Sequence, residues 1–280
     1  MKLKNLLLIL IIAFTSLNIS AQNINQKIVI PLSMPDQVGT LYADVYSGKI
    51  TVNGYSGKEV IIEASVRERR SNHDDCDHCD EVKESKVPEG MRIIDNNSFS
   101  LDAVEKENKV YVQVETRNQT IDLNIQVPEN FLLKLESHRN GGILIENVKG
   151  AEIEVECNNG DVSLQNIASP VVIDAHRGDV DILFAETNSE NPTSVTTYSG
   201  DINITFPAKS KAVLKFKSEN GNVYADEKLN INANPPKVIS SSKNGANKYS
   251  IENWMYAQMN GGGSEFQFST YRGNVFIRVN

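Results

Sequence analysis

The sequence predicts an all-β protein, built as a single-stranded parallel β-helix, or β-solenoid, with coils of about 20 residues. Three observations lead to this prediction. Hydrophobic and polar residues alternate over short runs, a glycine-centred turn recurs at near-constant spacing, and the turn formers asparagine and glycine are abundant in the 280-residue chain. We find no run of hydrophobic residues at helical spacing in the mature chain. A β-sandwich is the alternative, since it also joins short strands by regular turns.

The first 21 residues are expected to form a secretory signal peptide. Lys2 and Lys4 precede an apolar run that reaches Phe14, and the segment ends on the small residue Ala21. We therefore expect residues 22–280 to form one β-solenoid domain that is exported to the periplasm, the cell surface or the medium.

The charge of the chain limits the classes of partner. Loss of Lys2 and Lys4 changes the formal net charge from −8 to −10. Nucleic acid is not expected as the main partner, because a phosphate backbone requires a basic surface. No later stretch approaches the length of a membrane-spanning helix, so we expect no transmembrane segment after signal cleavage.

A turn of the form polar–Gly–polar–Val/Ile follows most of the predicted strands. It occurs at 46–50, 139–143, 158–162, 176–180, 198–202, 219–223 and 271–275. The glycines that we take as coil corners are spaced by 18, 18, 22 and 21 residues: Gly142, Gly160, Gly178, Gly200 and Gly221. A residue without Cβ turns the chain at low cost, so one such glycine is expected at a corner of each coil.

Between these turns the side chains alternate strictly. Within 151–157, Ile153, Val155 and Cys157 share one face and three glutamates share the other. The same alternation predicts strands at 121–127, 180–184, 202–206 and 212–217. Cys157 is thus expected to be a buried free cysteine without chemistry of its own.

The segment at 39–54, the run of Gly-Asp-Val/Ile turns and the ending at 260–278 resemble the putative adhesin family of Bacteroidota. That family consists of secreted β-solenoids similar to auto-transporter adhesin head domains, and the ending looks like its closing coil. The resemblance covers about residues 25–280. It implies a non-enzymatic adhesin or surface-interaction protein that binds a glycan, a protein or a cell-envelope component.

Aromatic residues gather toward the C-terminus. They are Trp254, Tyr256, Phe266, Tyr271 and Phe276. An exposed solenoid end templates aggregation, so we expect some of these side chains to cover the open end of the last coil.

The segment at 67–95 interrupts the repeat and is expected to be a long loop insertion. Within it, His73, Cys76, His78 and Cys79 offer imidazole and thiolate groups, which are the preferred donors for zinc or copper. In an exported protein a Cys76–Cys79 disulfide is the alternative, and two free thiols are a third.

A second candidate is the corner ladder, which we define as Asp161, Asp179 and Asp201. Each follows a corner glycine, so a solenoid would stack these carboxylates along one edge, with Asn222 next. They could accept hydrogen bonds from turn amides, bind calcium, or act as a catalytic pair in a sugar-cleaving enzyme.

The sequence therefore favours a non-enzymatic interaction protein. We expect no cofactor, with a calcium or zinc ion at one of these candidate sites as the alternative. One alternative is a carbohydrate-active β-helix enzyme that uses the corner ladder. Another is a metal-binding envelope protein that acts through the loop at 73–81. No Ser–His–Asp arrangement or phosphate-binding loop is recognisable in the sequence.

Overall fold

The computed structural model describes residues 26–67, 99–114, 116, 118–187, 191–227, 229, 231–234, 238–243, 246–251 and 254–280. The expected signal peptide and the predicted loop beyond Arg67 lie outside these residues, and so do His73, Cys76, His78 and Cys79. Within the described ranges the chain forms strands and turns, and no helix there is long and apolar enough to cross a membrane. The prediction of an all-β protein is confirmed.

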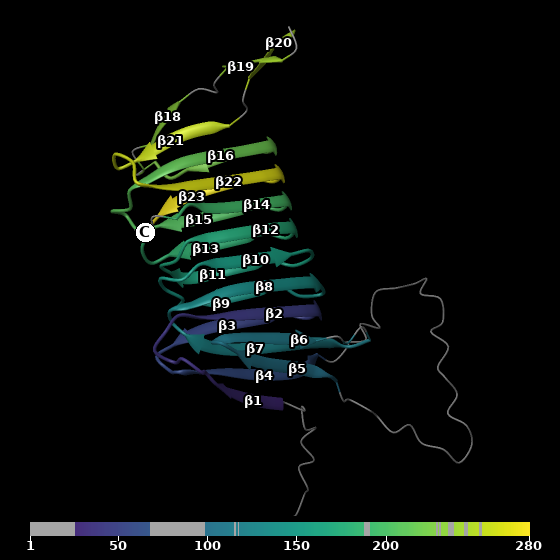
Figure 1. The fold of residues 1–280 in the computed structure, drawn as a ribbon. Helices are drawn as coiled ribbons and strands as arrows, with labels where there is room; N and C mark the ends of the chain where they lie inside the picture. Colours follow the sequence, from purple (N-terminus) through teal and green to yellow (C-terminus); the bar gives the residue numbers. More distant parts are fainter. Residues whose placement is uncertain are drawn as a thin grey trace, which may run out of the picture.

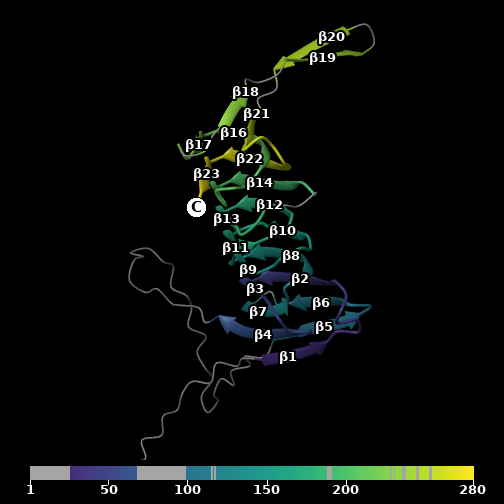
Figure 2. The same ribbon diagram turned by 90° about the vertical axis from the view of Figure 1, so that its left-hand side faces the viewer.

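The strands form two large sheets and one hairpin, and successive coils stack into an elongated body (Figures 1 and 2). In spatial order, the ten-stranded sheet A contains β1 (Gln26–Pro31), β4 (Glu59–Arg67), β7 (Thr120–Pro128), β3 (Ile50–Tyr55), β9 (Ile143–Glu146), β11 (Val162–Ile167), β13 (Val180–Phe184), β15 (Ile202–Phe206), β23 (Val275–Val279) and β17 (Val223–Ala225). The eleven-stranded sheet B contains β18 (Ile231–Asn234), β21 (Met255–Met259), β16 (Ala212–Asn220), β22 (Ser264–Arg272), β14 (Thr193–Ser199), β12 (Val171–Arg177), β10 (Ile153–Cys157), β8 (Phe131–Arg139), β2 (Gly39–Ser47), β6 (Lys109–Val114) and β5 (Leu101–Lys106). The hairpin consists of β19 (Val238–Lys243) and β20 (Ala246–Ile251).

Each central coil gives one strand to sheet B and the next strand to sheet A. From β8 to β15 the coils stack in sequence order as parallel, in-register strands, so Val155 pairs with Leu135 on one side and with Ile173 on the other. Inward residues of both sheets form one hydrophobic core, and these three side chains are at most 2% exposed. Burial of this column of side chains is the main source of the stability of the stack.

Both large sheets are mixed, so a single-stranded parallel β-helix is too simple a description. In sheet A, β4 pairs antiparallel with β1 and with β7. In sheet B, β5 pairs antiparallel with β6, and β21 pairs antiparallel with β16 and β18. The parallel repeat thus occupies the middle of the body. Antiparallel strands complete one end in both sheets and the other end in sheet B, whereas sheet A ends there on β17, which is parallel to β23.

The order of the coils in space differs from their order in sequence. The coil β2–β3 lies between β6–β7 and β8–β9, and the C-terminal coil β22–β23 lies between β14–β15 and β16–β17. The β22 strand is therefore not at the open end, and its aromatic residue Phe266 is not one of those that could cover it. Phe266 lies in the core, with ring centroids 5.5 Å from Phe184 and 5.1 Å from Phe206.

Corner glycines form a column along the stack, but its member after Arg139 is Gly141 and not the predicted Gly142. In spatial order the column is Gly48, Gly141, Gly160, Gly178, Gly200, Gly273 and Gly221. From Gly141 onward, a Cβ atom built on each of these glycines would lie 2.0–2.2 Å from the carbonyl oxygen of the preceding one. Contact between adjacent backbones, in addition to the turn itself, therefore requires glycine.

Small polar side chains line the inner side of the same corner. Ser137 Oγ donates a hydrogen bond to the Gly141 carbonyl at 3.3 Å, and Cys157 Sγ donates to the Gly160 carbonyl at the same distance. Cys157 is buried and has no disulfide partner, as predicted, and burial raises its pKa to about 11. The thiol thus stays protonated at neutral pH and occupies the position of a serine hydroxyl in the next coil.

Candidate functional site

The outer face of sheet B carries four carboxylates side by side on adjacent strands. We call this set the acidic row; it consists of Asp44, Glu136, Glu156 and Asp174, from β2, β8, β10 and β12. Neighbouring parallel strands lie about 4.8 Å apart, and like charges directly opposite one another destabilise a sheet. The row therefore concentrates negative charge at a local cost in stability, which favours association with a cation or a positively charged partner.

A surface concavity of about 320 Å³ opens beside the row at its β2 end. The stacked rings of Tyr42 and Tyr111, with centroids 4.7 Å apart, form part of its wall. Lys134, the cation among the lining residues, already forms an ion pair with Glu154 at 2.5 Å, and the hydrogen bond to Glu154 raises the pKa of Lys134. The concavity thus combines aromatic surface with a net negative charge.

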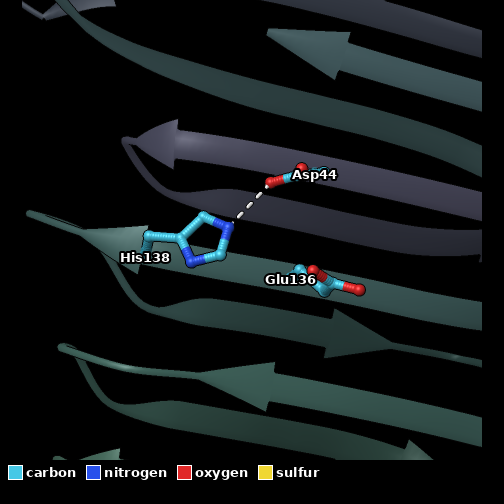
Figure 3. Close-up of side chains that lie close together, drawn as sticks. All are labelled: Asp44, Glu136 and His138. Atoms are coloured by element: carbon cyan, nitrogen blue, oxygen red, sulfur yellow. Dashed lines mark hydrogen bonds and ion pairs between the residues drawn. The ribbon is translucent and has the colours of Figure 1, made fainter. Parts of the chain in front are cut away.

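Three polar side chains lie close together on this face (Figure 3), and two of them, Asp44 and Glu136, line the concavity. Glu136 and His138 are two residues apart on β8 and point to the same face, and Asp44 is directly opposite Glu136 on β2. His138 Nε2 lies 3.1 Å from Asp44 Oδ1. One nitrogen and two carboxylate oxygens of these residues lie within 4.8 Å of one another, which is a donor set suited to a divalent cation.

An aromatic and imidazole row runs along the strand ends of the same face, just before the corner. The rings of His176 and Tyr198 are 5.1 Å apart, and those of Tyr198 and Tyr271 are 5.0 Å apart and nearly parallel. Because the ring faces cover one another, these side chains mainly stabilise the stacking of the coils. Their edges reach solvent, since Tyr198 is 45% exposed and Tyr271 is 43% exposed.

The structure places the corner ladder in successive turns. Asp161 Oδ1 accepts a hydrogen bond from the Asp179 amide at 2.9 Å, and Asp179 Oδ1 accepts one from the Asp201 amide at 2.8 Å. The next position belongs to Asn274, whose amide donates to Asp201, and Asn222 follows only after it. The carboxylates therefore link each turn to the next through backbone amides.

The sequence did not predict the group of Asp44, Glu136 and His138. Buried and more exposed side chains alternate along β2 and β8, and all three residues fall on the outer side. Nothing in the sequence signals that β2 pairs with β8, because the strands in between, β4 to β7, stack elsewhere. The predicted loop donors cannot be compared with this group, since they lie outside the described residues.

The fold and this face together define a class: an all-β repeat protein with a rigid outer sheet face that carries an acidic row and an adjoining concavity. The chain belongs to the Toastrack DUF4097 family, whose model matches residues 9–254. Similarity to auto-transporter adhesin head domains, and an origin in Bacteroidota, stay predictions.

Solved structures that are similar to the chain include the following two. One is a "putative cell adhesion protein" from Clostridium sporogenes ATCC 15579, with 13% identity, a TM-score of 0.43, and coverage of 92% of this chain and 100% of that chain. The other is a "putative adhesin" from Bacteroides fragilis NCTC 9343, with 8% identity, a TM-score of 0.34, and coverage of 93% and 98%. No curated protein matches the chain.

Proposed function

We propose that the protein is a non-enzymatic, exported interaction protein of the adhesin type, which binds an external partner through the outer face of sheet B. The observation that carries this proposal is the acidic row with its adjoining concavity. Stacked coils hold these side chains on a rigid surface, so little conformational entropy is lost when a partner binds. Export is inferred from the signal-peptide pattern at 1–21.

The charge of the face favours one kind of partner. Lys134 forms an ion pair with Glu154, which leaves Asp44, Glu136 and Glu156 to set the negative potential of the concavity. Complementary charge accelerates association and rejects partners of the same sign. We therefore favour a protein or envelope component with a positively charged surface over an acidic polysaccharide.

The carbohydrate-active alternative receives less support from the corner ladder. A glycosidase needs one carboxyl group as an acid and a second as a base or nucleophile, both directed at the sugar. Asp161 and Asp179 instead each accept a hydrogen bond from a backbone amide of the following coil. A role in turn structure accounts for these residues without a reaction. Metal binding by the loop at 73–81 stays a separate proposal from the sequence.

A binding screen with paired variants tests the proposal. The purified protein is assayed against arrays of glycans, matrix proteins and fractionated cell envelopes. The variant E136Q/E156Q removes two charges from the outer face of sheet B, and E146Q/D181N removes two from the outer face of sheet A. We expect binding that weakens with added salt and is lost in E136Q/E156Q but kept in E146Q/D181N. The proposal is wrong if no component binds, or if both variants bind as the parent does.

A further inference from the structure

We propose that Asp44, Glu136 and His138 form a binding site for a divalent cation of the zinc class on the outer face of sheet B. The proposed ligands include none of the Cys/His residues of the loop singled out in the sequence, and the site does not depend on the identity of any macromolecular partner. It would hold the cation through one imidazole nitrogen and two carboxylate oxygens.

The geometry suits a small cation. Zinc binds histidine nitrogen and carboxylate oxygen at about 2.0–2.2 Å, so two ligands of one tetrahedral ion lie about 3.4 Å apart. His138 Nε2 and Asp44 Oδ1 are already 3.1 Å apart. Glu136 has its ligand atom within 4.8 Å of both, and its exposed side chain can move closer by rotation about its own bonds. Three protein ligands leave a fourth position for water or a donor of a partner.

The chemistry of the donors selects among cations. Calcium and magnesium prefer sites made wholly of oxygen, whereas an imidazole nitrogen is a preferred ligand of zinc, copper and nickel. His138 gives the group a nitrogen donor that neighbouring parts of the acidic row lack. The mixed nitrogen and oxygen set therefore favours a transition-metal ion over calcium.

Asn158 lies where it can supply the outer-shell contact that such a histidine needs. Its side-chain nitrogen Nδ2 lies 3.2 Å from His138 Nδ1, whereas Asp44 lies beside the other ring nitrogen, Nε2. A histidine that binds a metal through Nε2 carries its proton on Nδ1 and donates it to a neighbouring acceptor. The two ends of an Asn amide differ by a rotation of 180°, so Asn158 can present its oxygen to that proton.

The surroundings of the group favour a bound cation in two further ways. Glu156 lies next to Glu136 in the acidic row and adds negative charge. The concavity is lined by Asp44 and Glu136, so an ion and its remaining waters have access from solvent. His176 provides a contrast on the same face, because its ring stacks against Tyr198 at 5.1 Å.

Calorimetric titration with Zn²⁺ alone tests the site. The background is the C76S/C79S chain, in which the loop thiols cannot contribute. Two variants, H138Q and H176Q, differ only in which histidine of this face is replaced. We expect one saturable event that is lost in H138Q and unchanged in H176Q. The variant N158A should weaken affinity by about 10- to 100-fold, as is typical when an outer-shell partner is removed.

A second measurement locates the ion even if a variant folds poorly. In the unsubstituted chain, Co²⁺ should broaden the ring signals of His138 in a proton–nitrogen NMR spectrum well before those of His176. The proposal is overturned if H138Q and H176Q bind Zn²⁺ with equal affinity, or if Co²⁺ broadens His176 first. It is also overturned if D44N binds as the parent does, because that change removes a charged ligand.

Discussion

Replacing Gly178 by alanine tests whether the spacing of the coils is fixed by backbone contact at the corner. A Cβ atom at this position would lie 2.2 Å from the Gly160 carbonyl oxygen, 2.5 Å from its carbon and 3.0 Å from the Asp161 amide nitrogen. All three are backbone atoms of the neighbouring coil. They cannot move aside as a flexible side chain can, so the two coils must separate.

The expected loss of stability has two parts. Gly178 has φ = +136°, a conformation that is costly for any residue with a Cβ, by about 1–3 kcal/mol. Relief of the steric overlap adds about 1–3 kcal/mol, as for other overpacked sites. We therefore expect G178A to lower the free energy of unfolding by about 2–6 kcal/mol.

Urea unfolding followed by circular dichroism measures this loss, and Gly261 provides a matched control. Gly261 also has positive φ, +89°, but no atom lies within 4 Å of a Cβ built there. G261A should therefore show only the conformational part, about 1–2 kcal/mol. If G178A loses no more stability than G261A, backbone contact does not fix the corner and the reasoning is refuted.

Three further predictions concern the core, the corner ladder and the buried thiol. Phe206 is fully buried, so F206A should lower the free energy of unfolding by about 3–5 kcal/mol in urea. Y198A, on the exposed face, should lower it by about 1 kcal/mol. Equal losses in the two variants would contradict the assigned core. D179N keeps an oxygen that can accept the hydrogen bond from the Asp201 amide, so its free energy of unfolding should match that of the parent within about 0.5 kcal/mol. D179A loses this hydrogen bond and should be less stable by about 1 kcal/mol. A large loss in D179N would show that the charge is needed. The pKa of Cys157 is raised from 9.0 to about 11, so native protein should resist alkylation of this thiol at neutral pH. Because the pKa of Cys157 is higher in the folded state, its contribution to the free energy of unfolding is fully present below about pH 9 and is lost as the pH rises toward about 11. Urea midpoints of the parent and of C157S, measured across this pH range, test the shift. A difference between the two midpoints that does not change with pH would contradict it.

Local features of the fold could be predicted from the sequence because they depend on neighbouring residues. Alternation of Ile153, Val155 and Cys157 with glutamates is a property of one strand, and it gives the strand, its inner face and the buried cysteine. The corner turns are also local, although Gly141 and Gly142 could not be told apart. Only contact with the next coil, at Gly160, selects Gly141 as the member of the column.

The order of the coils could not be predicted for a physical reason. The turns at 46–50 and 271–275 follow the same pattern as those of the central coils, so local sequence does not specify which neighbours they pair with. Long-range pairing places the last coil inside the stack and brings Asp44 next to His138, which is 94 positions away. The candidate site depends on this pairing, and for that reason the sequence did not reveal it.

A cross-linking experiment tests the central claim that one continuous outer face is assembled from coils out of sequence order. In a chain whose native cysteines are replaced by serine, the pairs Y198C/Y271C and Y198C/E219C are oxidised and analysed by peptide mass spectrometry. The rings of Tyr198 and Tyr271 are 5.0 Å apart on adjacent strands β14 and β22, and a disulfide spans Cα atoms about 4.4–6.8 Å apart. Glu219 on β16 lies one strand further, at about 9.6 Å. We expect the 198–271 disulfide to form and the 198–219 disulfide to be absent; a 198–219 disulfide without a 198–271 disulfide would contradict the account.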